Sequence, residues 1–133
     1  MPRPKTDGPT KRELEILQVL WQRGPSTTKE VQETLSKKHK LAYNSVQTIL
    51  LIMCEKKFVS RAESGIGKTH LYTAKQSKAD MEGKLVKSFM DNVFEGSAMM
   101  LVTRALSLEP TSKEDKEKIR QVLEQEKGYE EPS

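Results

Sequence analysis

The hydrophobic positions of residues 41–57 recur with the period of an α-helix. One face, at positions i, i+3, i+4 and i+7, carries the apolar residues Val46, Ile49, Leu50 and Met53. The other side of the first two turns carries uncharged hydrogen-bonding residues: Tyr43, Asn44, Ser45, Gln47 and Thr48. Short polar groups at the start of a helix are suited to reading base edges in the major groove of DNA. The pattern therefore predicts a helix that packs by one face and reads DNA with the other.

Two β-rich runs follow this helix without a linker. Phe58 and Val59 begin the first strand, and residues 70–72 belong to the return strand. Gly65 and Gly67 allow the tight reversal between them. A helix followed directly by a basic hairpin is the core of a winged helix, and this is the fold that we expect here.

Two earlier helical patterns precede residues 41–57, and each opens with a capping signal. Thr10 and Glu13 have the spacing of a capping box, in which each side chain bonds the other residue's backbone N–H. Thr27 and Glu30 repeat this spacing. We therefore expect three helices before the hairpin, of which the second and third form a helix-turn-helix pair.

From residue 77 onward the chain changes to helical patterns with broad apolar faces. Residues 98–106 are apolar on nearly every side, and a helix of this kind must be buried. Too little chain remains to bury it, so we expect a second copy of the protein to cover it. The residues expected in this dimer interface are Leu85, Phe89, Val93, Met99, Leu101, Val102, Leu106, Ile119 and Leu123.

These patterns predict a mainly α protein with a small β-hairpin wing. The expected architecture is a winged helix-turn-helix domain followed by a carboxy-terminal helical dimerisation region. We expect a flexible basic arm at residues 1–9 and a DNA-binding domain at residues 10–75. The dimerisation region then covers residues 76–127, and residues 128–133 form a frayed tail.

The charge distribution supports a nucleic-acid partner for the front half of the chain. Residues 1–75 contain 14 Lys and Arg against 7 Asp and Glu, whereas residues 76–133 contain 9 against 12. Positive potential on the half that holds the predicted reading helix is typical of a surface that faces phosphates. An ordinary surface with uneven charge is the alternative interpretation of these counts.

Several other classes of protein receive no support from the sequence. No apolar run is long enough to cross a bilayer, and the single Cys54 cannot form an internal disulfide, so we expect a cytoplasmic protein without a membrane partner. No nucleophile with a supporting base, phosphate loop or metal-ligand spacing is present in the sequence. We therefore expect no enzymatic activity, no cofactor and no metal site.

Short motifs spread over residues 10–123 are similar to those of one bacterial family. They are T-x-x-E-x-x-I-L-x-V-L-W at 10–21, G-P-S-T-x-x-E-V at 24–31, A-Y-N-S-V-x-T-I-L at 42–50, G-K-x-x-L-Y at 67–72 and F-E-G-S at 94–97. Each motif is weak alone, but their order and spacing together are specific. In these residues the chain resembles the penicillinase-repressor family, which includes methicillin-resistance repressors and a copper-responsive branch.

The resemblance implies a homodimer that binds inverted-repeat operators in double-stranded DNA and represses the adjacent genes. In the family the third helix reads the major groove and the wing touches the backbone. The base readers implied here are Tyr43, Asn44, Ser45, Gln47 and Thr48, and the implied phosphate contacts are Lys40, Arg61 and Lys68. A winged helix used only for protein contact and a non-specific DNA-binding protein are the competing interpretations.

Several positions depart from the family pattern, among them His70, which replaces a usual aromatic residue in the wing. Ile52 stands where the family usually has arginine, and Lys57 stands where a glycine normally ends the third helix. A regulatory protease cuts an Asn-Phe bond in the antibiotic-responsive members, and Arg104-Ala105 occupies that position here. A regulatory protease therefore stays open as a partner of this chain.

Overall fold

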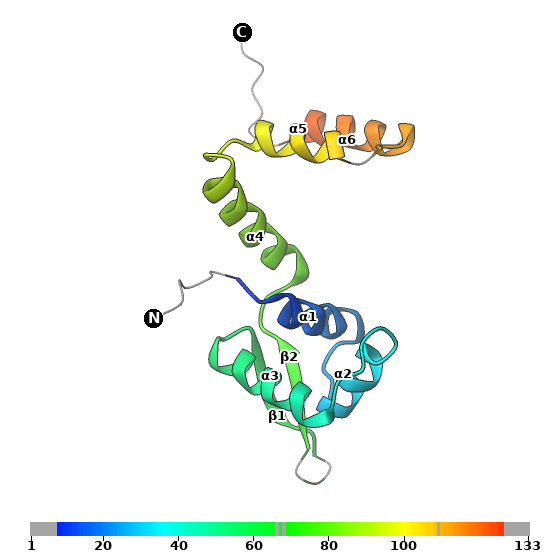
Figure 1. Cartoon of the computed structure of the whole chain (residues 1–133), viewed down its shortest axis with the longest axis vertical. Helices are drawn as coiled ribbons and strands as arrows, with labels where there is room; N and C mark the ends of the chain where they lie inside the picture. Colours follow the sequence, from blue (N-terminus) through cyan, green and yellow to red (C-terminus); the bar gives the residue numbers. More distant parts are fainter. Residues whose placement is uncertain (1–7, 66, 68, 109, 127–133) are drawn as a thin grey trace. The chain divides into compact units, whose positions relative to one another are not determined.

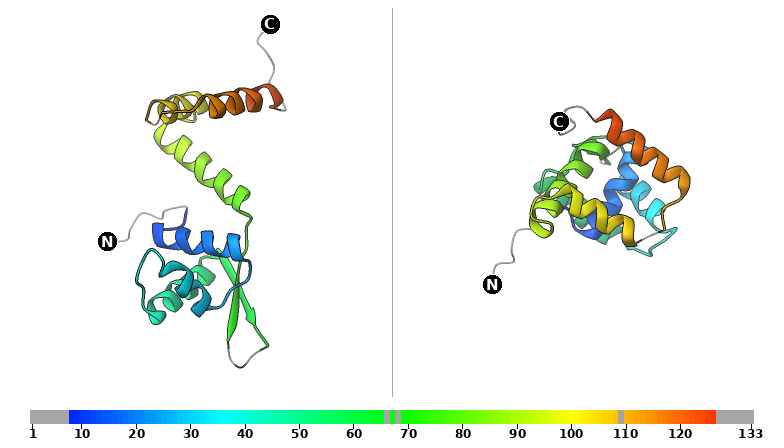
Figure 2. Two further views of the ribbon diagram at one scale, coloured as in Figure 1. Left: turned by 90° about the vertical axis from the view of Figure 1, so that its right-hand side faces the viewer. Right: turned by 90° about the horizontal axis from the view of Figure 1, so that it is seen from above.

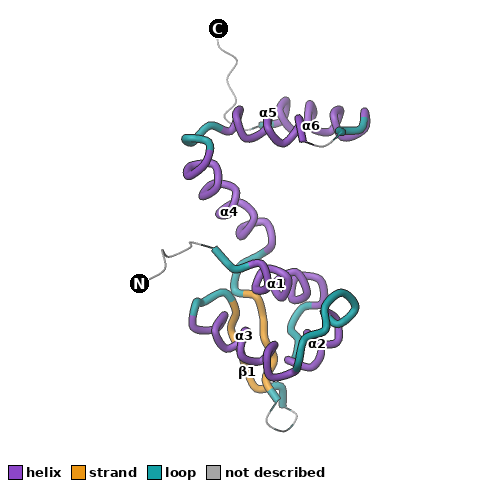
Figure 3. The backbone as a smooth tube through the Cα atoms, viewed as in Figure 1, coloured by secondary structure: helices purple, strands orange, loops and turns teal. Residues whose placement is uncertain are grey.

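A computed structural model of the chain describes residues 8–65, 67, 69–108 and 110–126 (Figure 1). The elements, in chain order, are α1 (Lys11–Arg23), α2 (Thr28–Leu35), α3 (Tyr43–Glu55), β1 (Val59–Glu63), β2 (His70–Ala74), α4 (Lys78–Val93), α5 (Ala98–Leu108) and α6 (Lys113–Gln125). Three helices, a two-stranded hairpin and further helices follow one another along the tube of Figure 3. The prediction of a mainly α winged helix with carboxy-terminal helices is confirmed.

The chain divides into two compact units, Met1–Ser88 and Phe89–Ser133, with the division inside α4. We call them the amino-terminal unit and the carboxy-terminal unit. The amino-terminal unit contains one hydrophobic core, to which α1, α2, α3, both strands and the start of α4 contribute. Its buried apolar residues are Ile16, Leu17, Val19, Leu20, Val31, Leu35, Val46, Leu50, Met53, Val59, Tyr72 and Met81.

Reciprocal capping boxes begin α1 and α2, as the sequence predicts. The Thr10 hydroxyl accepts a hydrogen bond from the Glu13 N–H at 3.1 Å, and Glu13 Oε1 accepts one from the Thr10 N–H at 2.9 Å. Thr27 and Glu30 make the same pair of bonds, at 3.1 and 2.9 Å. The Glu13 carboxylate is buried and also accepts from Lys56 Nζ at 3.0 Å, which ties the start of α1 to the end of α3.

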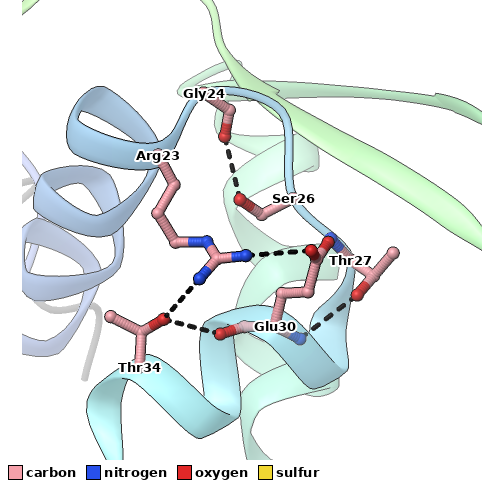
Figure 4. Close-up of polar contacts among 6 residues, drawn as sticks. All are labelled: Arg23, Gly24, Ser26, Thr27, Glu30 and Thr34. Atoms are coloured by element: carbon pink, nitrogen blue, oxygen red, sulfur yellow. Dashed lines mark hydrogen bonds and ion pairs between the residues drawn. The ribbon is translucent and has the colours of Figure 1, made fainter.

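A polar network holds α1 against α2 (Figure 4). Gly24 ends α1 at a φ of 85°, and its carbonyl accepts from Ser26 Oγ at 2.9 Å. Arg23 Nη2 donates to Glu30 Oε2 at 2.9 Å across the turn. The Thr27 N–H, which donates to the Glu30 carboxylate, is the main reason that the pKa of Glu30 lies below its ordinary value, and the Arg23 charge lowers this pKa further.

The hairpin packs on the helices through its base. The left view of Figure 2 shows β1 and β2 side by side, and they pair antiparallel with Val59 opposite Ala74 and Arg61 opposite Tyr72. Ser26 joins β2 by two backbone bonds to Tyr72, at 3.0 and 2.8 Å. Buried Val59 and Tyr72 lie on one face of the hairpin, and this face adjoins the core.

The start of α4 belongs to the amino-terminal unit. Trp21 Nε1 donates to the Gln76 carbonyl at 2.9 Å, just before the helix begins. Met81 is buried in the core, and Leu85 packs against it from one turn later. A Cβ added to Gly8 would meet Leu85 Cδ2 at 2.6 Å, so residue 8 runs close beside α4. These contacts fix the first two turns of α4 to the unit.

The carboxy-terminal unit contains the end of α4 together with α5 and α6. The Ser97 hydroxyl caps α5 by accepting from the Met100 N–H at 3.1 Å, and Ser112 caps α6 at 3.0 Å through the Asp115 N–H. Within the described part of this unit no residue is fully buried. Its helices therefore form without enclosing a core of their own. Over the whole described chain, no helix combines the length and the hydrophobicity that crossing a bilayer requires.

The end of α3 is a Schellman turn with a lysine in the glycine position. Lys57 adopts a left-handed φ of 67°, while its N–H bonds the Cys54 carbonyl at 3.1 Å. The next N–H, of Phe58, bonds the Met53 carbonyl at 2.9 Å, which completes the motif. Lys57 has a Cβ, so the left-handed backbone is strained here, whereas the glycine of the family pattern adopts it without strain.

We predict that Lys57→Gly stabilises the amino-terminal unit by about 1 kcal/mol, because glycine adopts the left-handed conformation without the Cβ clash. Denaturant unfolding followed by circular dichroism measures the change. The matched control is Glu55→Gly, in the helical last turn of α3, which should destabilise by about 1 kcal/mol. Equal destabilisation by both variants would contradict the prediction.

Candidate nucleic-acid interface

Helix α3 has a fully buried face and an outward face. Val46, Leu50 and Met53 are completely buried in the core. Successive residues of a helix are turned by about 100°, so the direction opposite these three is occupied by Asn44, Thr48 and the residues one turn later. The buried face therefore determines which side chains α3 can offer to a partner.

All five predicted base readers lie on the first two turns of α3. Tyr43, Asn44, Ser45 and Thr48 are exposed, and Gln47 is half-buried at the edge of the outward face. The predicted helix begins at Tyr43, and Ala42 precedes it without a side-chain cap. The structure thus places these residues on the accessible first two turns of α3. Tyr43 lies seven residues before buried Leu50, and it is exposed at the start of the helix.

The outward face also carries two apolar residues that our sequence-based list of base readers omitted. Leu51 is 36% exposed and Ile52 is 39% exposed. Leu51 lies seven residues after Asn44, and Ile52 lies four residues after Thr48, so both continue the surface of the predicted readers. The sequence already indicated this exposure, because the helical spacing of Val46, Leu50 and Met53 leaves residues 51 and 52 outside the buried face.

Cationic side chains flank α3 at two places. Lys40 is exposed in the turn that leads into α3, and Lys37 and Lys38 precede it in the same turn. Arg61 is exposed on β1, on the hairpin face shared by Val59. Lys68, the third predicted phosphate contact, lies outside the described residues.

Arg61 lies on a strand that packs against α3. Strand β1 adjoins α3, and Arg61 is its third residue. Partial burial raises the pKa of the Cys54 thiol on α3, and the Arg61 charge opposes the rise. The predicted wing cation and the predicted reading helix therefore belong to adjoining elements.

Some cations of the amino-terminal unit are paired with carboxylates and others are not. Three are held by carboxylates at 2.8–3.0 Å, namely Arg12, Arg23 and Lys56. Lys40 and Arg61 make no ion pair with any residue that the structure describes. Their charge is therefore not neutralised within the unit, and it remains available to an anionic partner.

The predicted dimerisation residues differ in how exposed they are. Leu85 packs on the core of the amino-terminal unit. In the carboxy-terminal unit, Leu101 and Ile119 are half-buried, and the remaining predicted residues are exposed. The exposed residues are Phe89, Val93, Met99, Val102, Leu106 and Leu123. A hollow of about 520 Å³ lies between α5 and α6, lined by Leu106, Ile119 and Leu123 among others.

Arg104 and Ala105 lie inside α5, and both are exposed. The family resemblance aligned these two residues with a cleavable Asn-Phe bond, and this alignment stays a prediction. Helical backbone bonds its own N–H and C=O groups, so a protease that acts here needs local unwinding of α5.

Comparisons with known proteins agree with this geometry. A family model described as "Penicillinase repressor" matches residues 9–125. A penicillinase repressor of Bacillus licheniformis is 27% identical over 116 residues, which cover 87% of this chain and 89% of that protein. A solution structure of the monomeric form of Bacillus licheniformis BlaI, in complex with the blaP half-operator, is 28% identical. It covers 57% of this chain and 90% of its own, with a TM-score of 0.48.

The family match covers most of the chain, including all three helices of the amino-terminal unit, the hairpin and the helices that follow. The chain therefore belongs to the penicillinase repressor family, a family of DNA-binding winged-helix transcription regulators that are not enzymes.

Proposed function

We propose that this protein is a homodimeric repressor that recognises an inverted-repeat operator in double-stranded DNA. The observation that carries the proposal is the outward face of α3, which presents exposed polar side chains. Lys40 lies in the turn before this helix and Arg61 lies on the adjoining strand β1, and neither cation has a carboxylate partner among the described residues. Polar groups on a helix surface with unpaired cations at its flanks match a major groove between two phosphate backbones. The BlaI relative was solved in complex with a half-operator, which supports the same assignment.

In this proposal the amide side chains carry most of the base discrimination. Asn44 and Gln47 each present a donor and an acceptor, and such amides pair with adenine through its N6 and N7 atoms. Ser45, Thr48 and Tyr43 add single hydroxyl groups that either donate or accept. The five residues read bases or orient the side chains that do.

The flanking cations position α3 without reading sequence. Lys40 before the helix and Arg61 on β1 contact phosphates, and Lys68 at the wing is the third proposed contact. Such contacts set the register of the protein on the duplex and supply affinity that depends strongly on salt.

Dimerisation through the carboxy-terminal unit pairs two reading helices. The exposed apolar residues of α5 suit a two-fold interface, because an isologous dimer covers the same patch on both copies. Two α3 helices related by two-fold symmetry then read half-sites of opposite orientation, which makes the operator an inverted repeat.

The decisive experiment is selection of bound sequences from a random duplex pool at near-physiological salt. We expect a two-fold symmetric consensus, because two copies of α3 read equivalent half-sites. Recovery of no consensus would reject specific recognition and leave non-specific DNA binding or a protein-contact module.

Gln47→Ala should relax base preference in each half-site while the fold remains intact. Loss of a good base contact removes about 1–3 kcal/mol of discrimination at the base pair concerned. Binding to the consensus and to single-base variants measures this loss, and the helical signal of the free protein reports folding. Unchanged discrimination between base pairs would show that Gln47 is not a base reader.

Arg61→Ala should weaken binding to every sequence by a similar factor. Loss of one phosphate contact in each copy should make the slope of log K against log salt shallower by about 2 for the dimer. A titration of operator binding over a range of salt concentrations gives this slope. The matched control, Lys113→Ala on α6, removes the same charge from the other unit and should leave the slope unchanged.

Val102→Asp should convert the dimer to monomers, because an interface cannot bury an unpaired carboxylate without a cost of about 3 kcal/mol or more. Analytical ultracentrifugation measures the oligomeric state, and operator binding should weaken with it. Ser107→Asp introduces the same charge at an exposed position of α5 that is turned about 140° from Val102, and it should remain dimeric. A Val102→Asp protein that sediments as a dimer would place the interface elsewhere.

A further inference from the structure

Three neighbouring side chains of α3 place apolar groups on an exposed surface next to the proposed base readers. Leu51 and Ile52 are large aliphatic residues on α3, and Thr48 contributes a methyl group three and four residues before them. Residues at these spacings are neighbours on a helix. We call Thr48, Leu51 and Ile52 the aliphatic patch.

Packing within the amino-terminal unit covers only part of the aliphatic patch. The core side of α3 is occupied by Val46, Leu50 and Met53, which are completely buried. Leu51 is turned about 100° from Leu50 on the helix, and it keeps 36% of its surface exposed, while Ile52 keeps 39%. Complete burial of these two side chains therefore requires a surface outside this unit.

The surroundings of the patch indicate what that surface is. The patch continues directly from Asn44 and the other proposed base readers. Lys40 and Arg61 flank the helix, and neither has a carboxylate partner among the described residues. An apolar patch between unpaired cations is complementary to a partner that combines an anionic backbone with exposed apolar groups. The major groove of DNA has this combination.

We propose that the aliphatic patch reads thymine by contact with its C5-methyl group. This inference rests on the proposed function and adds to it a second kind of recognition. The thymine methyl is the one apolar group that a base pair presents in the major groove. Cytosine presents an amino donor and guanine presents acceptors there, and an aliphatic side chain that covers them removes water without replacing its hydrogen bonds. The patch therefore favours thymine and disfavours a G·C pair.

The position of the thymine follows from helix geometry. Leu51 lies seven residues beyond Asn44, which is about 10 Å along the helix axis at 1.5 Å per residue. With α3 lying along the groove, this distance corresponds to about three base pairs at 3.4 Å each. The thymine contacted by the patch should thus lie about three base pairs from the pair at which Asn44→Ala relaxes preference.

The test replaces thymines of the selected operator by deoxyuridine, one at a time, with the full-length protein. Deoxyuridine lacks only the C5-methyl and leaves every hydrogen-bonding group unchanged. The wild-type protein should lose about fourfold in affinity at one or two positions of each half-site, the factor that corresponds to one buried methyl-sized group.

Leu51→Ala and Ile52→Ala should bind the thymine operator more weakly than the wild type. At least one of them should also bind the thymine and deoxyuridine duplexes equally well at a sensitive position. Gln18→Ala, an exposed position on α1, is the control and should keep the full deoxyuridine penalty. Circular dichroism confirms that each variant is folded. If an alanine variant does not fold, the smaller changes Leu51→Val and Ile52→Val replace it in the same comparison of thymine and deoxyuridine duplexes.

Specific operator binding with no sensitivity to deoxyuridine at any position would overturn the inference and leave the proposed function intact. A full deoxyuridine penalty in both alanine variants would also overturn it, because other residues would then read the methyl groups. Unchanged operator affinity in both variants would assign the patch to protein contact instead. Absence of any specific site in the selection would reject the proposed function itself, and this inference with it.

Discussion

The fixed phase of α3 is the constraint on which the interface depends. Val46, Leu50 and Met53 are buried without remaining exposure, so rotation of α3 about its axis would lift them from the core. Removal of a buried Leu or Met side chain to the size of alanine costs about 2–5 kcal/mol, which shows how strongly such anchors hold a helix. The same anchors give Asn44 and Thr48 their outward direction. Packing and recognition are thus two consequences of one helical periodicity.

Charge pairing separates structural cations from those available to a ligand. Lys56 is bound by the buried Glu13, which joins the end of α3 to the capping box of α1, and Arg23 is bound by Glu30 between α1 and α2. These pairs position helices. Arg61, by contrast, has no carboxylate partner in the described part of the chain and lies on β1, which adjoins α3. Net charge alone does not make this distinction, because it counts paired and unpaired cations equally.

Local patterns in the sequence predicted the amino-terminal unit well. The capping boxes at Thr10 and Thr27 depend on residues three apart, and the apolar stripe of α3 depends on one helix, so each is readable without tertiary information. The left-handed backbone at Lys57 was expected from the family resemblance, because a glycine normally ends this helix in the family. Leu51 and Ile52 were not assigned to the reading face, because an apolar residue in a sequence is more easily assigned to a core than to an outward surface.

The helices after the hairpin were harder to interpret from sequence. Leu85 continues the apolar stripe of α4 and was assigned to the dimer, yet in the structure it packs on the core of the amino-terminal unit near Gly8. Contacts between residues far apart in the chain decide such cases, and periodicity does not encode them. Periodicity did identify the apolar surface of α5, where Met99 is 77% exposed in the single chain. Which surface covers these residues of α5 depends on how copies of the protein assemble.

The hairpin has a further consequence for the solution behaviour of the protein. Within the described residues β1 pairs only with β2, so its outer edge presents unpaired backbone N–H and C=O groups. Such an edge is a template for the strands of other molecules, and charged side chains on a short strand discourage that pairing. β1 is five residues long and carries Arg61 and Glu63. The charges of Arg61 and Glu63 on this short edge strand are of the kind that discourages such pairing between molecules, independently of any contact with DNA.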